Sequence, residues 1–205
     1  MKGNLEVMIK RIVFLLRGVK KIVYCYYFDS VNRITFKRQD VTIRGKAIIV
    51  GKIFVSNRGT ISIGASFRAN SGYNKNPIGG DTILRLICMK NAKLMIGDNV
   101  SMSNSTILAK TSIVLEDNVM MGGSCRIWDT DFHSMDYTIR GTEYDIGLSK
   151  PILVRKNAFI GAGVIILKGV TIGENSIIAA GSVVSKSVPS NEVWGGNPAK
   201  FIRKL

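Results

Sequence analysis

A period of six residues runs through residues 154 to 189 and constrains the fold more than any other feature of the chain. Six consecutive hexads occur there, VRKNAF, IGAGVI, ILKGVT, IGENSI, IAAGSV and VSKSVP. Each begins with Ile or Val and has a small or β-branched fifth residue. This period matches neither the 3.6-residue turn of an α-helix nor a long alternating strand. It predicts a short strand and a corner, repeated as stacked coils that bury a common core.

The same period occurs earlier in the chain, with a slip of one residue after Leu108. The expected inward first positions are Ile43, Ile49, Val55, Ile63, Ile96, Met102, Leu108, Leu115, Met121 and Ile127. Two segments, 70–82 and 129–150, break the period. Such insertions are usually extruded from a solenoid as loops, and they often carry function. We therefore expect an all-β fold, a parallel β-helix over 43–189, with two extruded loops and a C-terminal tail over 190–205.

Residues 1–42 form a basic N-terminal segment with helical spacing. Its apolar residues fall on one stripe, Leu5, Met8, Ile9, Ile12, Leu16, Val19, Ile22 and Val23. Basic residues interrupt the apolar stretch and disfavour a membrane-spanning helix, namely Lys10, Arg11, Arg17, Lys20 and Lys21. Residues 1–46 carry eleven Lys or Arg and three Asp or Glu, which is eight of the chain's fifteen net positive charges. Two interpretations stay open, an amphipathic helix on an anionic membrane surface and a cap over the open core.

Composition excludes several other classes of protein. A chain of 205 residues, 46% of them hydrophobic, can bury a single core. Cys25, Cys88 and Cys125 lie far apart and form no C-x-x-C pair, so we expect no disulfide framework, no cysteine metal site and a reducing cytoplasm. No secretory signal, P-loop or nucleic-acid-binding motif is present, so no nucleic-acid partner is expected despite the positive charge.

The only histidine of the chain, His133, lies in the longer break, within RIWDTDFHSMDY. Histidine can take a proton from a weak nucleophile at neutral pH, and a nearby carboxylate can fix its tautomer. Asp131 and Asp136 are the candidates for that carboxylate. The alternatives are a loop histidine without a special role and aspartates that cap turns. Cys125 lies at an inward hexad position and is expected in the core, so no covalent acyl-enzyme is expected.

Four features together resemble the left-handed β-helix, hexapeptide-repeat acyltransferases over residues 43–205. They are the hexads, the motif DTDFH, the run FIGAGVIILKGVTIGENSIIAAGSVVSK and the ending GGNPAKFIRK. The chain is most similar to the sugar and polysaccharide O-acetyltransferases near the maltose and galactoside acetyltransferases. The resemblance implies a left-handed coil, a homotrimer, no metal, and acetyl-CoA bound between neighbouring prisms in sites shared by two subunits.

The resemblance also assigns roles to single residues. Catalysis falls to His133 with Asp131, and the backbone N–H of Ala162 stabilises the oxyanion. Contacts with acetyl-CoA fall at Ala162, Ala180, Ser185, Lys186 and Arg203, the last two suited to its phosphates. Contacts with the acceptor fall at Asn104, Asp129 and Asp136. The carboxylate that binds sugar in galactoside-type members aligns near Lys110, so a free galactoside is not the expected acceptor.

The expected function is acetyl-CoA-dependent O-acetylation of a sugar hydroxyl on a surface polysaccharide or its precursor. Two alternatives stay open, N-acylation of an amino sugar by the same fold and a noncatalytic β-helix scaffold recruited to membranes by its charge. The expected location is the cytoplasm, at the inner face of the plasma membrane if the N-terminal helix binds there.

Overall fold

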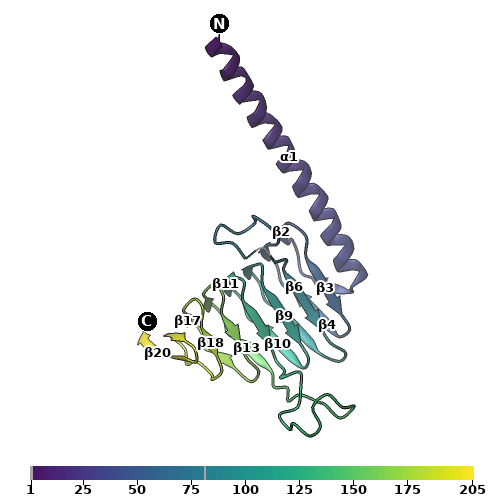
Figure 1. Ribbon diagram of the computed structural model, residues 1–205, viewed down its shortest axis with the longest axis vertical. Helices are drawn as coiled ribbons and strands as arrows, with labels where there is room; N and C mark the ends of the chain where they lie inside the picture. The colour runs from purple at the N-terminus through teal and green to yellow at the C-terminus, as the bar shows by residue number, and fades with distance from the viewer. Residues whose placement is uncertain (1, 81) are drawn as a thin grey trace.

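The computed structural model describes residues 2–80 and 82–205 and shows one long helix followed by a three-sided parallel β-helix (Figure 1). Each coil contributes one short strand to each of three sheets and then turns a corner. Strands of successive coils pair in parallel. The fold is the all-β, left-handed parallel β-helix that the sequence predicts.

We name the sheets A, B and C in the order in which the chain meets them. Sheet A holds β1 (Val41–Ile43), β4 (Thr60–Ile63), β7 (Lys93–Ile96), β10 (Ser112–Leu115), β13 (Ile152–Val154) and β16 (Thr171–Ile172). Sheet B holds β2 (Ile48–Val50), β5 (Arg68–Asn70), β8 (Ser101–Ser103), β11 (Met120–Gly123), β14 (Phe159–Ile160), β17 (Ile177–Ile178), β19 (Glu192–Gly196) and β20 (Ala199–Lys204). Sheet C holds β3 (Phe54–Asn57), β6 (Arg85–Cys88), β9 (Thr106–Ala109), β12 (Arg126–Trp128), β15 (Ile165–Ile166) and β18 (Val183–Val184). The corners between sheets stack into three columns, which we call AB, BC and CA.

The hexad pattern correctly predicts the core. All twelve first and fifth positions of the six regular hexads are buried, namely Val154, Ile160, Ile166, Ile172, Ile178, Val184, Ala158, Val164, Val170, Ser176, Ser182 and Val188. In sheet C, Ile127, Ile166 and Val184 stack in register. Burying one such aliphatic side chain contributes roughly 1.5–3 kcal/mol, so the stack stabilises coils that could not fold alone.

The irregularity of the period begins one corner earlier than predicted, before β9 and not after Leu108. In β9, Ile107 and Ala109 are buried and Leu108 is only half-buried. Ile107 follows Met102 by five residues, so the BC corner before β9 is one residue shorter than a hexad requires, and Asn104 in that corner adopts a positive φ of 46°. Asn tolerates this left-handed conformation better than most residues, which suits a tight corner. The CA corner after β9 is longer, since Leu115 follows Ile107 by eight residues.

The predicted tail over 190–205 instead forms the end of sheet B. β19 pairs in parallel with β17, and β20 returns antiparallel to β19. The hairpin therefore extends sheet B beyond the last coil, and Trp194 and Ala199 of its two strands pack against the core.

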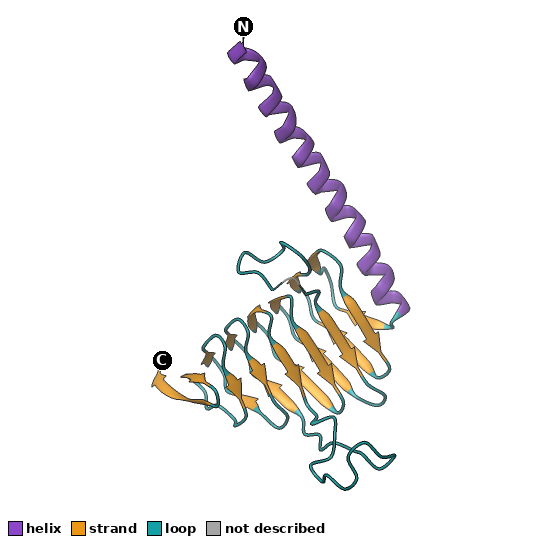
Figure 2. Cartoon of the chain, viewed as in Figure 1, coloured by secondary structure: helices purple, strands orange, loops and turns teal. Residues whose placement is uncertain are grey.

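The N-terminal helix α1 (Lys2–Arg38) contacts the first strands of the solenoid, β1, β2 and β3, through its C-terminal part. Asn32 is buried there, where its Nδ2 donates to Gly51 O at 2.8 Å and its Oδ1 accepts from Ile53 N at 3.2 Å. Phe36 is buried beside it. The cap interpretation therefore holds for this end of the helix, while the rest of α1 projects away from the coils (Figure 2).

The projecting part of α1 exposes more apolar surface than the predicted stripe. Its exposed large apolar side chains are Ile12, Val13, Phe14, Leu15, Leu16, Val19 and Val23. Val13, Phe14 and Leu15 lie outside the stripe, so the apolar surface is wider than predicted. The side chains of residues 1–10, 17, 20–22 and 25, including predicted Leu5, Met8, Ile9, Ile22 and Cys25, lie outside the described part of the chain. Among the described residues, no helix combines the length and the hydropathy needed to cross a membrane.

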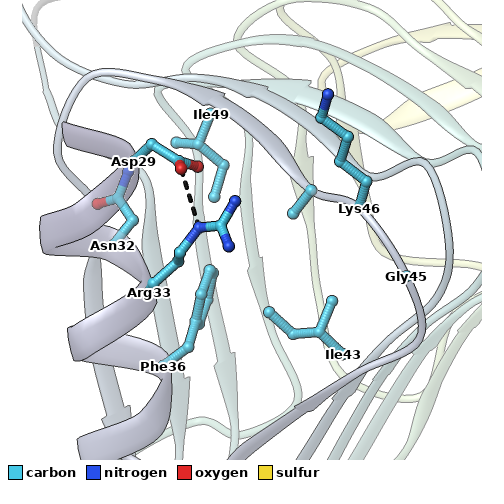
Figure 3. A pocket seen from close by; sticks show the side chains of 9 residues that line it. Asp29, Asn32, Arg33, Phe36, Ile43, Gly45, Lys46 and Ile49 are labelled. Atoms are coloured by element: carbon cyan, nitrogen blue, oxygen red, sulfur yellow. Dashed lines mark hydrogen bonds and ion pairs between the residues drawn. The ribbon is translucent and has the colours of Figure 1, made fainter. Parts of the chain in front are cut away.

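A cavity of about 320 Å³ separates α1 from the first coil (Figure 3). Phe36, Ile43 and Ile49 line it, together with the ion pair between Asp29 and Arg33, whose atoms lie 2.8 Å apart. Ile43 and Ile49, predicted to point inward, are only half-buried. No preceding coil covers them, and the helix covers them incompletely.

Candidate active site

The loop that contains His133 leaves the solenoid at the CA column, between β12 and β13, and projects away from the coils (Figure 1). Its two ends are held together by a short antiparallel contact. Asp131 N donates to Leu148 O at 2.9 Å, Lys150 N donates to Asp129 O at 3.0 Å, and Thr130 bridges to Ser149. A closed neck of this kind fixes where the loop begins and ends.

Asp129 lies at the neck, and its carboxylate organises the corner of the preceding coil. Its oxygens accept from Lys110 N at 2.6 Å, from Thr111 N and Ser112 N at 2.7 Å, and from Thr111 Oγ1 at 2.6 Å. The residue is fully buried. The structure contradicts the prediction that Asp129 contacts the acceptor, because its carboxylate is buried in the wall of the solenoid and fully hydrogen-bonded there.

Asp131 was expected to orient His133, but it faces another residue. Its Oδ1 lies 2.6 Å from Lys168 Nζ, on the next coil of the CA column. Only its backbone carbonyl meets the histidine, accepting from His133 N at 2.8 Å. The charged partner of Asp131 is thus Lys168, and this ion pair fastens the loop to the solenoid.

The carboxylate that contacts the His133 ring is Asp145. Asp145 Oδ2 lies 2.7 Å from His133 Nδ1, and its Oδ1 accepts from Ser134 N at 2.5 Å. The Asp145 side chain is 7% exposed and the His133 side chain 69% exposed. With Nδ1 directed at the carboxylate, Nε2 is the ring nitrogen left to meet an incoming proton. The arrangement suits a general base with a positioning carboxylate.

Asp145 remains ionised at neutral pH. Hydrogen bonds from the backbone N–H of Ser134, the side chain of His133 and the backbone N–H of Gly141 lower its pKa from 3.8 to about 2. Hydrogen bonds to the charged form favour that form, so Asp145 is a lasting negative partner for the imidazole. Sequence alone offered little signal for it, because it lies twelve residues after His133 in a segment without periodicity.

Gly147 lets the returning limb of the loop pass directly behind the histidine. A Cβ at this position would lie 2.6 Å from Phe132 C and 2.7 Å from His133 N. Phe132 itself has a positive φ of 65°, which is uncommon for a bulky residue. Close packing at Gly147 therefore holds the backbone that carries His133.

Asp136 lies at the exposed side of the same loop. Its Oδ1 accepts from Thr138 Oγ1 at 2.7 Å and from Thr138 N at 2.9 Å, and these bonds lower its pKa. An open pocket of about 560 Å³ lies beside it, lined by Lys110, Ser134, Met135, Asp136, Ile146, Gly147, Leu148 and Ser149. The predicted acceptor contact of Asp136 stays a prediction, with a pocket beside it that could receive a ligand.

The remaining predicted residues divide between two columns of corners. Asn104, Ala162 and Ala180 lie on BC, whereas His133, Ser185 and Lys186 lie on CA. Arg203 lies on β20 at the end of sheet B. In a single chain, His133 and Ala162 therefore occupy opposite edges of sheet C. The structure brings His133 together with Asp145, but not with the predicted oxyanion donor of the same chain.

Asn104 is buried, with both ends of its amide bonded to the loop after β5. Its Oδ1 accepts from Gly72 N at 2.9 Å, and its Nδ2 donates to Gly80 O. Contrary to the prediction, the Asn104 side chain does not face an acceptor in this structure but anchors the loop after β5.

Cys125 behaves as the predicted core residue. It is fully buried, its Sγ contacts Gly161 O at 3.1 Å, and burial raises the pKa of its thiol. A buried thiol with a raised pKa is a poor nucleophile.

The chain is similar in sequence to a known protein family and to individual proteins. The model of the family described as bacterial transferase hexapeptide (six repeats) matches residues 151–186. The chain is 41% identical over 104 residues to a galactoside O-acetyltransferase of Lactococcus lactis, covering 50% of this chain and 48% of that protein. The chain covers 48% to 59% of the length of three curated relatives that it matches.

The solved structures that are similar to the chain include two acetyltransferases. One is a hexapeptide-repeat acetyltransferase of Vibrio cholerae complexed with acetyl coenzyme A, at 35% identity and a TM-score of 0.53, covering 58% of this chain and 63% of that one. The other is a maltose O-acetyltransferase of Clostridium difficile, at 25% identity and a TM-score of 0.58, covering 90% of this chain and 87% of that one.

Proposed function

The chain belongs to the hexapeptide-repeat transferases, and we propose that it transfers an acetyl group from acetyl-CoA to a sugar hydroxyl. One observation carries the proposal. On an extruded loop of the solenoid, Asp145 holds His133 Nδ1 at 2.7 Å and leaves Nε2 open. The named activity of the L. lactis relative and the acetyl-CoA in the V. cholerae structure support the same reaction.

In this reaction His133 Nε2 takes the hydroxyl proton as the sugar oxygen attacks the thioester carbonyl. The C–O bond forms, the C–S bond breaks, and the proton passes from the imidazolium to the leaving thiolate of CoA. Asp145 stabilises the imidazolium while it exists. The backbone N–H of Ala162 is proposed as the donor to the oxyanion, because a fixed N–H favours the charge that develops there.

The donor site and the base are proposed to meet between subunits of a homotrimer. Ala162 and Ala180 lie on the BC column, where small side chains let a pantetheine arm approach the coil. Ser185 and Lys186 lie on CA, the column of His133. The BC column of one subunit facing the CA column of its neighbour would unite the two sets. Lys186 and Arg203 would then meet the CoA phosphates.

The acceptor is proposed to be a surface polysaccharide or its precursor. Lys110 lines the pocket beside Asp136, where galactoside-type members place a carboxylate near the aligned position. The positive charge of Lys110 favours an acceptor that carries negative charge, or one that does not depend on the carboxylate with which galactoside-type members bind sugar. The reaction is placed in the cytoplasm, in keeping with the free, buried thiols of Cys88 and Cys125.

The projecting part of α1 is proposed to lie on an anionic membrane, close to such a precursor. It exposes Phe14, Leu15 and Leu16 in succession, and the sequence around them is rich in Lys and Arg. Apolar burial together with electrostatic attraction drives this kind of binding, and salt weakens it. Intact protein should sediment with anionic vesicles at low salt, and a variant starting near Val31 should not. Equal sedimentation of both, or none by either, contradicts membrane binding and leaves α1 as a cap.

The transferase proposal is tested by the release of CoA thiol from acetyl-CoA in the presence of a sugar panel, with the product analysed by mass spectrometry. Ester products on hydroxyl sugars support O-acetylation. Amide products on amino sugars alone would favour the N-acyltransferase alternative. Absence of acetyl-CoA binding by calorimetry would favour the noncatalytic scaffold over both enzymes.

A further inference from the structure

The proposed donor residues determine how a bound acetyl-CoA would be oriented along the BC column. Ala162 and Ala180 lie at its last two corners, so a bound acetyl-CoA would extend from Ala162 toward the C-terminal end. The acceptor must then approach Ala162 from the N-terminal side. On that side the column carries the second extruded loop, which connects β5 to β6.

This loop folds back along the column toward Ala162. A Cβ at Gly123 would meet the side chain of Asn76 and would lie 3.4 Å from Ile78 Cδ1. Gly123 O in turn accepts from Gly163 N at 2.7 Å, and Gly122 packs on Ala162. Asn76 and Ile78 are thus placed one coil away from the proposed oxyanion donor.

The loop is held in a defined shape. Asn104, buried beneath it, bonds Gly72 at one end and Gly80 at the other. The loop also contacts α1, where Lys75 Nζ lies 4.0 Å from the centroid of the Tyr24 ring. A loop fixed at its base and side keeps its tip positioned without a ligand, which lowers the entropic cost of binding.

Two apolar side chains of the loop face solvent, Tyr73 at 71% and Ile78 at 65% exposure. An aromatic ring with a polar tip, such as Tyr, suits a ligand that is apolar on its ring face and polar at its edge. A pyranose ring is such a ligand. We infer that residues 72–80 form the acceptor-recognition loop of the proposed transferase, with Tyr73 and Ile78 contacting the sugar; this inference rests on the proposed function.

The experiment compares Tyr73→Ala and Ile78→Ser with the wild-type chain, using maltose, an oligosaccharide of uronic acid and glucosamine as probe acceptors. Tyr26→Ala is the matched control, since Tyr26 is 73% exposed and lies on α1. We expect KM for the best probe to rise about tenfold in each loop variant, with KM for acetyl-CoA unchanged, because uniform acceptor binding is lost. Both loop substitutions replace exposed side chains, and circular dichroism together with light scattering checks folding and assembly.

The outcomes separate the two proposals. Wild-type activity with unchanged acceptor KM in both loop variants overturns the inference and leaves the transferase standing. Failure of the wild-type chain to acetylate any probe, despite binding acetyl-CoA, overturns both. Equal rises in acceptor KM for the loop variants and Tyr26→Ala would also overturn the inference, since the effect would not belong to the loop.

Discussion

At the scale of single residues, the sequence singled out the proposed base and missed the carboxylate that contacts it. His133 was recognisable because it is the only histidine and follows DTDF in a break of the period. The nearest carboxylates in sequence have other partners. The carboxylate of Asp129 accepts hydrogen bonds from the backbone of the preceding corner, and Asp131 forms an ion pair with Lys168. Only the path of the loop, which returns Asp145 to His133, decides which carboxylate contacts the ring.

Asp145→Asn should lower kcat by about a hundredfold or more, since the same change in a Ser-His-Asp triad costs about 10⁴-fold. The amide keeps the size of the side chain but loses the charge that stabilises the imidazolium. Steady-state kinetics should show an unchanged KM for acetyl-CoA. Asp145→Glu, which keeps the charge, should recover part of the rate. Equal rates for the Asn variant and the wild type would remove Asp145 from the mechanism.

The lowered pKa of Asp145 also predicts a pH window for the loop. Because the pKa is lower in the folded chain, about 2 against 3.8, the stability that Asp145 contributes is complete above about pH 4 and is lost as pH falls through about 2. Hydrogen exchange should show the N–H groups of Ser134 and Gly141 protected at pH 4 and above and progressively exposed below it. In Asp145→Asn the protection should be weaker and should not titrate in that window. Identical profiles for both proteins would contradict the assignment.

At the scale of elements, the hexads predicted the coils because inward positions recur at fixed spacing. The irregularity at β9 was misplaced, since Leu108 is as hydrophobic as Ile107 and the pattern does not show that the corner before β9 is one residue short. α1 was predicted as one amphipathic stripe, but Phe14 and Leu15 widen its apolar surface. The structures of both loops were beyond prediction, because single contacts such as those of Asn104 and Gly147 set them.

Gly147→Ala tests whether the loop backbone positions the base. The added methyl group would lie 2.6 Å from Phe132 C and must displace the segment that carries His133. A displacement near 1 Å can cost about a hundredfold in rate, so we expect kcat to fall by about tenfold to a hundredfold. The melting temperature should change by less than about 3 °C, because the loop lies outside the stacked core. Gly18→Ala is the control, since nothing lies within 4 Å of its added Cβ. Full activity of Gly147→Ala would show that the loop tolerates the shift.

At the scale of the whole molecule, the separation of His133 and Ala162 on opposite edges of sheet C predicts a shared site. Light scattering should give about three times the chain mass of 22.5 kDa. His133→Ala and Ala162→Trp should each be inactive alone, yet a mixture assembled from both chains should regain about a quarter of wild-type activity if subunits combine at random. A fully active monomer, or mixed trimers without recovered activity, would contradict the shared site.

The central claim is that His133 is the base of an acetyl transfer, and one measurement tests it most directly. Turnover of acetyl-CoA with the best sugar acceptor is compared between the wild type and His133→Ala, with CoA affinity measured by calorimetry on the same samples. The account predicts unchanged CoA binding and assembly, and a loss of about a hundredfold or more in turnover, the usual range for a general base. Turnover within a few-fold of the wild type, with CoA bound equally well, would contradict it.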